Sequence, residues 1–166
     1  MTVVPTKSFA TVGGIIEINL LALTEGATRE KQVIEAVIPG MAAYGPCIRA
    51  GEFLLPSGLM AVGRDGHVAG RALSPGFAGL SHAGAVQAAA VYDYAEALCR
   101  AAGTAMAKTL RAQYFVSDRA QFPGIAMAWA ARFGATPHPF VCVQTPAAMP
   151  APGLALIADF WISTLA

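Results

Sequence analysis

The sequence predicts an α+β domain in which two helices cover one face of a single sheet. Three observations predict this class. Two segments repeat apolar residues at helical spacing, and a glycine follows each of them. Short runs rich in β-branched and aromatic residues lie between turn signals, as strands do. After one extra strand, the segments follow the order β-β-β-α-β-α-β-β, and two helices among these strands are expected on one sheet face.

The N-terminal part is expected to hold the extra strand and a polar connection. Residues 14–23, GIIEINLLAL, are rich in β-branched residues and leucine and are predicted as a strand. Residues 24–32, TEGATREKQ, form the most polar stretch and are expected to be a linker or an exposed loop. Residues 33–45 contain Pro39 and Gly40 and are expected to be irregular.

Three short strands are predicted before the first helix. They cover Cys47–Arg49, Glu52–Leu55 and a segment that runs from Ser57 to Val62. Ala50 and Gly51 separate the first two, where a tight hairpin turn is expected. The third strand is expected to end at residues 63–66, Gly-Arg-Asp-Gly, which are a turn signal.

The second half is predicted as two helices that alternate with three strands. The first helix runs from about Ser81, its N-cap, to Ala102, and the second from about Phe122 to Phe133. The predicted strands are Thr109–Ser117, Phe140–Gln144 and Leu154–Ile162. Alternation in the first of these places Leu110, Ala112, Tyr114 and Val116 on one face, and Arg111, Gln113 and Phe115 on the other.

The composition favours a folded chain that buries part of its surface in an oligomer. Of 166 residues, 55% are hydrophobic and 13% are charged, against roughly 25% charged in an average domain. Such apolar character excludes intrinsic disorder. The longest uncharged runs, 72–92 and 133–158, contain proline, glycine and histidine, so neither fits a membrane-spanning helix. We therefore expect a cytoplasmic protein whose open sheet face packs against other subunits.

Several chemistries find no support in the residues. The net charge is +1 without a basic run, which argues against nucleic-acid binding. Cys47, Cys99 and Cys142 lie far apart and are expected to be reduced thiols, and the histidines make no metal-ligand spacing with them. The sequence contains no P-loop, dinucleotide-binding glycine motif or GxSxG elbow, so neither a metal nor a cofactor is expected.

Residues 44–162 resemble the RidA/YjgF family of reactive intermediate deaminases in an ordered set of segments. The set comprises YGPCIRAGEFLLPSGLMAV (44–62), AAAVYDYAEALCRAAG (88–103), KTLRAQYFVSDRAQFPGIAMAWAARFG (108–134) and the closing strands PFVCVQTP and LALIADFWI. The resemblance implies a chorismate-mutase-like fold and a barrel-like homotrimer, or a higher oligomer of trimers, with a site at each subunit interface. It also implies hydrolysis of enamines or imines to ketoacids and ammonia.

Some residues of the family's site have counterparts in this chain, and others are replaced by a different residue type. Asp159 falls where the family has a glutamate on its last strand, and His138 falls at the position of an arginine that binds the substrate carboxylate. The predicted catalytic residues are therefore His138 and Asp159. The predicted substrate-binding residues are Ser57 and Gly58 at a strand start, Cys47 where the family often has tyrosine, and Tyr44 three residues earlier.

Most of these residues also have a structural interpretation, which for Ser57 and Gly58 is equally a turn at the start of a strand. His138 lies between two prolines and can equally be a surface histidine before a strand, and Asp159 can equally be held by structural hydrogen bonds. A buried thiol is favoured for Cys47, because no basic neighbour lies near it in the sequence. Arg111 and Arg132 are expected to be solvated, although either could replace the family's arginine from another element.

Two functions are compatible with this pattern. A divergent RidA-like hydrolase or deaminase would act on a small imine, enamine or related carbonyl compound at an intersubunit cleft, where His138 would bind substrate and Asp159 would move the proton. Alternatively, a non-catalytic ligand-binding or structural subunit would assemble with a complete RidA-like partner. The missing arginine favours this alternative.

The first residues resemble the end of a preceding RidA-like domain. Gly13–Leu21 aligns with Gly153–Trp161, which places Asn19 opposite Asp159. The predicted division is therefore 1–32, an extra strand with a linker, and 33–166, the RidA-like domain. We expect the extra strand to pair at a sheet edge of its own subunit, a neighbour or a companion chain. The alternative is a coincidental apolar strand.

Overall fold

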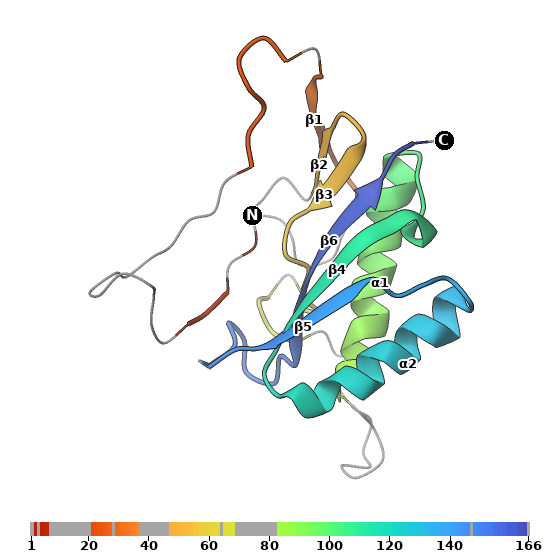
Figure 1. Cartoon of the computed structure of the whole chain (residues 1–166). Helices are drawn as coiled ribbons and strands as arrows, with labels where there is room; N and C mark the ends of the chain where they lie inside the picture. Colours follow the sequence, from red (N-terminus) through yellow and green to blue (C-terminus); the bar gives the residue numbers. More distant parts are fainter. Residues whose placement is uncertain are drawn as a thin grey trace.

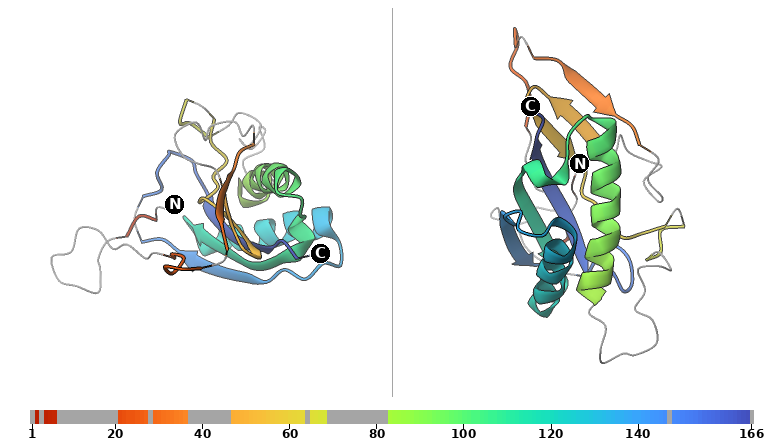
Figure 2. Two further views of the ribbon diagram at one scale, coloured as in Figure 1. Left: turned by 90° about the horizontal axis from the view of Figure 1, so that it is seen from above. Right: turned by 90° about the vertical axis from the view of Figure 1, so that its right-hand side faces the viewer.

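A six-strand sheet with two helices on one face forms the body of the chain. The computed structural model describes residues 2, 4–6, 21–27, 29–36, 47–63, 65–68, 83–146 and 148–165. The described strands form one sheet in the order β1-β2-β3-β6-β4-β5, and both helices cover the same face (Figures 1 and 2). The elements are β1 (Lys31–Ile34), β2 (Cys47–Ala50), β3 (Phe53–Pro56), α1 (Ala83–Ala101), β4 (Thr109–Val116), α2 (Phe122–Phe133), β5 (Phe140–Gln144) and β6 (Leu156–Ser163). The predicted α+β class is confirmed.

Both helices lie where their sequences predicted them. α2 carries a proline in its first turn, where the missing N–H removes no intrahelical bond, and Gly134 follows it with a φ of 58°. α1 stops just before Gly103, whose φ of 71° lies in the left-handed region that favours glycine. The limits of α2 match the prediction, and α1 ends one residue early. The predicted N-cap of α1, Ser81, lies outside the described residues.

The sheet is antiparallel except at its β5 edge. β2 and β3 form the predicted hairpin through Gly51, which has a φ of 59°. β6 runs antiparallel to both of its neighbours, β3 and β4. β4 and β5 are parallel, because α2 crosses over between them. The last strand of the chain therefore lies inside the sheet, between strands from both halves of the sequence.

The N-terminal half contains a strand that was not predicted. β1 lies where a linker and an irregular segment were expected, and it pairs with β2 from Lys31↔Ala50 to Ile34↔Cys47. Three of its four residues are exposed, and polar edge strands lack the apolar alternation that reveals a strand. β1 also spans residue 32, where the boundary between the N-terminal segment and the RidA-like domain was predicted. The predicted strand 14–23 lies mostly outside the described residues, and 21–23 have no regular secondary structure.

The segment Ser57–Val62 is not a continuous strand, contrary to the prediction. It contacts other segments through two isolated bridges, Leu59↔Ala158 and Val62↔Val68. The β3–β6 ladder covers Phe53 and Leu54, and contact with β6 resumes only at Leu59. The chain between them forms a bulge beside β6, and this bulge carries Ser57 and Gly58.

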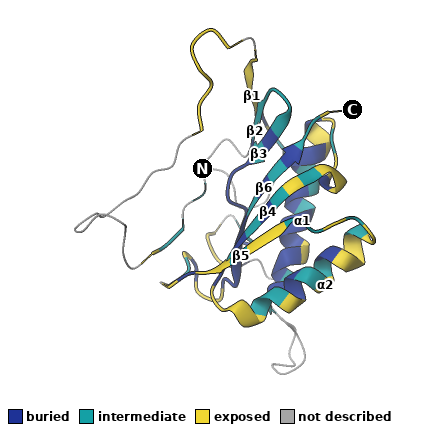
Figure 3. Cartoon of the chain, viewed as in Figure 1, coloured by how far each residue is buried: buried dark blue, intermediate teal, exposed yellow. Residues whose placement is uncertain are grey.

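The main core lies between the sheet and the two helices. Its largest buried side chains include Trp129, Tyr92, Tyr114 and Phe160. The opposite sheet face is open and apolar, with exposed valines on both outer strands: Val33 on β1, and Val141 and Val143 on β5 (Figure 3). Within the described ranges, neither helix combines the length and apolar character needed to cross a bilayer.

Candidate functional site

Asp159 lies on the open face of the sheet. Its neighbours in β6, Ala158 and Phe160, are fully buried toward the helices, so the alternation of the strand turns Asp159 the other way. Gln113 on β4 is its direct partner in the ladder. The bridge of Leu59 with Ala158 brings Gly58 alongside Asp159 from the other side. The carboxyl group is therefore placed within the sheet rather than at an edge.

Thr2 and Gly58 close one side of Asp159. The Thr2 hydroxyl donates a hydrogen bond to Asp159 Oδ2 at 3.1 Å. A Cβ added at Gly58 would lie 2.8 Å from Thr2 Cγ2 and 3.2 Å from Ile157 Cγ2, so only glycine permits this approach. Burial raises the pKa of Asp159 above its ordinary value, while the Thr2 hydrogen bond and the charge of Arg111 oppose the rise. A carboxyl group with a raised pKa is a better proton acceptor than an exposed one.

The structure thus brings three of the predicted site residues into one place. Ser57 is buried next to Gly58, and the bulge that contains both lies against β6 at Asp159. This proximity depends on the pairing of segments about 100 residues apart in sequence, since Leu59 and Ala158 exchange backbone hydrogen bonds of 2.7 and 2.9 Å. Backbone groups of the bulge and one titratable side chain together form the candidate site.

Replacing Thr2 by valine is expected to raise the pKa of Asp159 further. Valine keeps the shape of threonine but removes the hydroxyl that stabilises the ionised carboxylate. A ¹³C NMR titration of the Asp159 carboxyl carbon measures the change. Thr24→Val, at an exposed position, is the matched control and is expected to leave this pKa unchanged. An identical Asp159 titration in both variants would show that the Thr2 contact is absent in solution.

His138 lies on the opposite face of the sheet, among aromatic side chains near α2. Its ring stacks on Trp129 with centroids 4.2 Å apart and an interplanar angle of 4°. Its Nε2 lies 2.7 Å from the hydroxyl of Tyr114, which lies 2.9 Å from the hydroxyl of Tyr92. Because the sheet separates them, His138 and Asp159 of one subunit do not meet at one ligand. Their joint action stays a prediction that requires two subunits.

The pKa of His138 predicts a loss of stability in mild acid. Burial lowers this pKa from 6.5 to about 4, so the unfolded chain takes up the proton first as the pH falls. The stability from the neutral ring is complete above pH 6.5 and is lost as the pH falls toward 4. The ring is only half-buried, so we expect a loss of about 1–2 kcal/mol, less than the full linkage value.

Chemical denaturation at pH 7 and pH 4.5 tests this expectation. His138→Phe keeps an aromatic ring on Trp129 but cannot titrate, so its stability is expected to change less between the two pH values than that of the wild type. His67→Gln, at an exposed turn position, is the control and is expected to keep the wild-type difference. An unchanged pH dependence in His138→Phe would refute the assignment to His138.

Two further predicted residues lie away from Asp159 or outside the description. Cys47 is fully buried in the core, and burial raises its pKa to about 12, so it remains a protonated thiol at neutral pH. This agrees with the buried-thiol interpretation that the sequence favoured. Tyr44 lies outside the described residues. The substrate-binding role of both residues stays a prediction.

Arg111, Gln113 and Trp161 lie beside Asp159 in the β4–β6 pair, and of these only Arg111 was considered from the sequence, as a possible replacement for the family's arginine. Arg111 and Gln113 lie on the same face of β4 as one another, and their ladder partners on β6 are Trp161 and Asp159. The Arg111 guanidinium lies over the Trp161 ring, 5.4 Å from its centroid. The alternation of β4 already placed Arg111 and Gln113 on one face, and only the register with β6 was missing.

Arg132, the other arginine considered as a replacement for the family's arginine, forms ion pairs between the two helices. Its guanidinium contacts Asp93 at 2.7 Å and Glu96 at 2.6 Å. Both acidic residues belong to α1, so the pairs tie α2 to α1. Hydrogen bonds to Glu96 and Asp93 raise the pKa of Arg132. Its donors are therefore used within the subunit, in contrast to those of Arg111.

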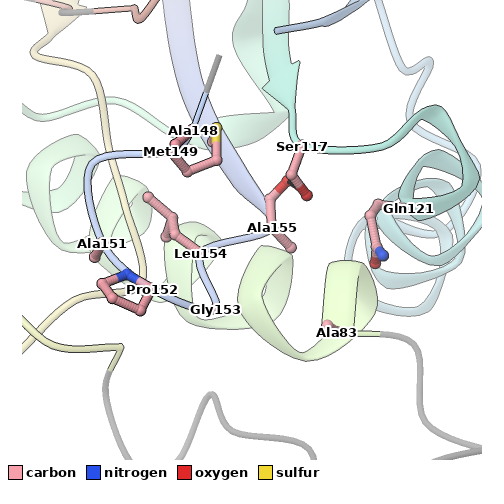
Figure 4. A pocket seen from close by; sticks show the side chains of 10 residues that line it. All are labelled: Ala83, Ser117, Gln121, Ala148, Met149, Ala151, Pro152, Gly153, Leu154 and Ala155. Atoms are coloured by element: carbon pink, nitrogen blue, oxygen red, sulfur yellow. Dashed lines mark hydrogen bonds between the residues drawn. The ribbon is translucent and has the colours of Figure 1, made fainter. Parts of the chain in front are cut away.

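A hollow near the start of α1 offers no chemistry of its own. It has a volume of about 460 Å³ and lies between the 148–155 segment, the first turn of α1 and the end of β4 (Figure 4). Its polar side chains are Ser117 and Gln121, and Gln121 Oε1 already accepts a hydrogen bond from the backbone N–H of Gly84 at 2.8 Å. None of its lining residues titrates. Within the described part of the chain, no cluster of three histidine, cysteine or acidic residues fits a metal ion.

Solved structures with this fold carry the names of the RidA/YjgF family. The Rid-family protein YyfA of Yersinia pestis superposes with a TM-score of 0.64 at 19% identity, covering 81% of this chain and 100% of its own. RidA from an Antarctic Psychrobacter species gives 0.61 at 18% identity, covering 80% and 98%. A YjgF-family member of Mycobacterium tuberculosis gives 0.59 at 17% identity, covering 81% and 100%. No model of a known protein family matches the sequence, and no curated protein matches it.

The chain therefore has the chorismate-mutase-like fold of the RidA/YjgF structures. The resemblance inferred from residues 44–162 is confirmed at the level of the fold, and the low identity is that of a divergent sequence.

Proposed function

We propose that the protein is a divergent RidA-like hydrolase that converts a small imine or enamine to a carbonyl compound and ammonia. The observation that carries the proposal is the placement of Asp159. It is a half-buried carboxyl group with a raised pKa on an open sheet face, and it lies beside the backbone of a glycine-containing bulge. The RidA fold supports the reaction class by analogy, since solved structures of that name share the architecture.

The reaction needs one group that moves protons and one water molecule. Water adds to the carbon of the C=N bond while Asp159 accepts a proton from it, and the proton then passes to the nitrogen. Collapse of the resulting carbinolamine releases ammonia and leaves a C=O bond, so the balance is imine plus water to carbonyl plus ammonia. A carboxyl group with a raised pKa suits both proton transfers, because its pKa then lies closer to that of the substrate nitrogen.

The open sheet face supports a second subunit as the other wall of the site. Its strands present Val33, Val141 and Val143, which are 52%, 49% and 42% exposed. Covering such a surface stabilises an assembly through apolar burial. We propose a trimer or a higher assembly of trimers, in which a neighbouring subunit covers this face and encloses Asp159.

An ammonia-release assay tests the proposed activity. 2-Iminopropionate is generated in situ from alanine by an amino-acid oxidase, and the disappearance of the imine is followed with and without the protein. The expected result is faster hydrolysis than in buffer, in proportion to protein concentration. A rate equal to that of buffer with 2-iminopropionate and with 2-iminobutyrate would refute the hydrolase proposal for this substrate class.

A second candidate is a non-catalytic subunit of a mixed assembly. The observation that favours it is the position of His138, which holds the place expected for the family's arginine but stacks on Trp129 and bonds to Tyr114. Purification of the tagged protein from its native host tests this candidate. Recovery of a RidA-like companion chain would support it, and recovery of the homo-oligomer alone would contradict it.

A further inference from the structure

The first described residues of the chain, Thr2, Val4 and Pro5, lie on the open face of the sheet. Figure 2 shows the N-terminal end of the ribbon on the side of the sheet that faces away from both helices. All three residues are half-buried. The hydrogen bond from the Thr2 hydroxyl to Asp159 spans 157 positions of the sequence, so the N-terminal residues fold back onto β6. We call Thr2, Val4 and Pro5 the N-terminal strap.

Thr2 fills the space between the bulge and the carboxyl group of Asp159. Its hydroxyl donates to Asp159 Oδ2 at 3.1 Å, and its Cγ2 and Cα would lie 2.8 and 3.2 Å from a Cβ added at Gly58. One residue thus contacts both parts of the candidate site. A ligand that reaches Asp159 from beside the Gly58 backbone needs this same space, and close-packed groups cannot share it.

The contact with Asp159 also resembles the first step of the proposed reaction. In that reaction a water molecule gives a proton to Asp159, so an O–H group must donate to the carboxyl group before the proton moves. The Thr2 hydroxyl is such an O–H group and already donates to this side chain. The strap therefore engages Asp159 as the attacking water would, but it brings no C=N bond to hydrolyse.

The strap is attached weakly enough to be displaced. Among the described residues, no backbone hydrogen bond joins Thr2, Val4 or Pro5 to the sheet, and none of the three lies in a helix or strand. The bond from Thr2 to Asp159 is the one hydrogen bond between the strap and another described residue. Segments with few buried contacts and few backbone hydrogen bonds open at a low cost in free energy.

We propose that the N-terminal strap is autoinhibitory, because Thr2 holds the position between Gly58 and Asp159 that a substrate must take. The inference rests on the proposed function, since it concerns access to that same site. Strap and substrate compete for one position, so the apparent affinity for substrate is reduced by the fraction of molecules in which the strap is open. A bound substrate has displaced the strap. The strap therefore acts on KM rather than on kcat.

Removal of the Thr2 side chain is expected to improve the enzyme. Thr2→Gly deletes both the hydroxyl and the methyl group, and is expected to lower KM for 2-iminopropionate by about three- to tenfold, as loss of a partly exposed hydrogen bond to a carboxylate does. Thr2→Ser restores the hydroxyl and is expected to recover most of the wild-type KM. Thr24→Gly, the same change at an exposed position, is the matched control and is expected to keep the wild-type KM. Damage to a structural contact would not improve KM.

Solvent access to Gly58 tests the inference without turnover. A dissolved nitroxide speeds the NMR relaxation of the amide protons that it can approach, and Thr2 lies against Gly58. Thr2→Gly is therefore expected to increase the relaxation enhancement of the Gly58 amide in the native assembly. Thr2→Ser is expected to reverse most of this increase, and Thr24→Gly is expected to match the wild type.

Three results would overturn the inference. The first is a relaxation enhancement at Gly58 that is equal in the wild type and Thr2→Gly. The second is a KM that Thr2→Gly leaves unchanged or raises. The third is a loss of oligomeric mass in Thr2→Gly that accompanies the larger enhancement, which would assign Thr2 to a contact between subunits. Sedimentation velocity on each variant measures this mass.

The two measurements separate this inference from the hydrolase proposal. If the enhancement at Gly58 rises in Thr2→Gly but no variant releases ammonia faster than buffer, the strap stands as the cover of this site and the hydrolase proposal fails. If the protein releases ammonia with the same KM in the wild type, Thr2→Gly and Thr2→Ser, the hydrolase proposal stands and the autoinhibitory strap fails.

Discussion

Asp159→Asn is expected to lower the rate of ammonia release by about 10²–10⁴-fold, the usual contribution of a general acid–base residue. Asparagine keeps the size of the side chain and can still accept the hydrogen bond from Thr2, but it cannot carry a proton. The raised pKa of Asp159 means that its ionised form costs stability at pH 7. The same variant is therefore expected to be at least as stable as the wild type at pH 7.

The combination of lost activity and retained stability separates a catalytic role from a structural one. If the Asp159 carboxylate served only structural hydrogen bonds, its replacement by asparagine would lower the stability of the protein. Asp159→Glu restores a carboxylate and is expected to recover part of the rate. Asp65→Asn, at an exposed turn position where the side chain bonds the N–H of His67, is the matched control. Full activity in Asp159→Asn would exclude Asp159 as the proton-transfer group.

Trp129→Ala is expected to lower the free energy of unfolding by about 3–5 kcal/mol, as deletion of a buried aromatic ring does. The Trp129 ring is almost fully buried, stacks on His138, and packs edge-on against Tyr92 at 5.7 Å. Its indole N–H also donates to the carbonyl of Thr136 at 3.1 Å. For a chain of this length the expected fall in Tm is roughly 6–20 °C.

Differential scanning calorimetry tests this expectation by comparing the Tm of Trp129→Ala with that of two further variants. Trp129→Phe keeps a ring in the cluster and is expected to lose less than half as much stability as Trp129→Ala. Met127→Ala changes a 64% exposed residue of the same helix and is expected to leave Tm nearly unchanged. A fall in Tm below about 2 °C for Trp129→Ala would contradict the packing role assigned to the aromatic cluster.

The second half of the fold could be predicted because its signals are local. The apolar spacing and the closing glycine define α2, and the run from Phe140 to Gln144 defines β5 with its observed limits. The alternation of β4 also predicted its faces, except at Leu110. That residue was expected on the same face as Ala112, Tyr114 and Val116, which are fully buried, but it is 55% exposed, because the pairing with β6 shifts register between Thr109 and Arg111.

The first half could not be predicted as well because its strands depend on distant partners. β1 has the residues of a polar loop and becomes a strand only because β2 offers it an edge. Ser57–Val62 has the residues of a strand, but its contact with β6 is reduced to one bridge. In both segments the pairing partner, rather than the local propensity, decides the structure.

The candidate site shows the same division between local and distant information. Asp159 could be identified as the single charge in an apolar strand, and its open face follows from alternation. The bulge at Gly58 and Arg111 lie near Asp159 only because of the register in which β6 pairs with Leu59 on one side and with β4 on the other. His138 could not be placed from sequence, because Trp129 and Tyr114, which surround it, come from other elements.

The hydroxyl chain from His138 to Tyr92 has a defined direction, and this direction selects one tautomer. Tyr92 donates to the backbone carbonyl of Ile125 at 3.3 Å, and a hydroxyl has only one hydrogen to give. Tyr114 must then donate to Tyr92, and Nε2 of His138 must carry the hydrogen that Tyr114 accepts. This tautomer is assigned from the hydrogen-bond network. In this tautomer Nδ1 is the basic atom of the imidazole, so the proton taken up in acid binds at Nδ1. Nε2 remains a hydrogen-bond donor to Tyr114 in both protonation states.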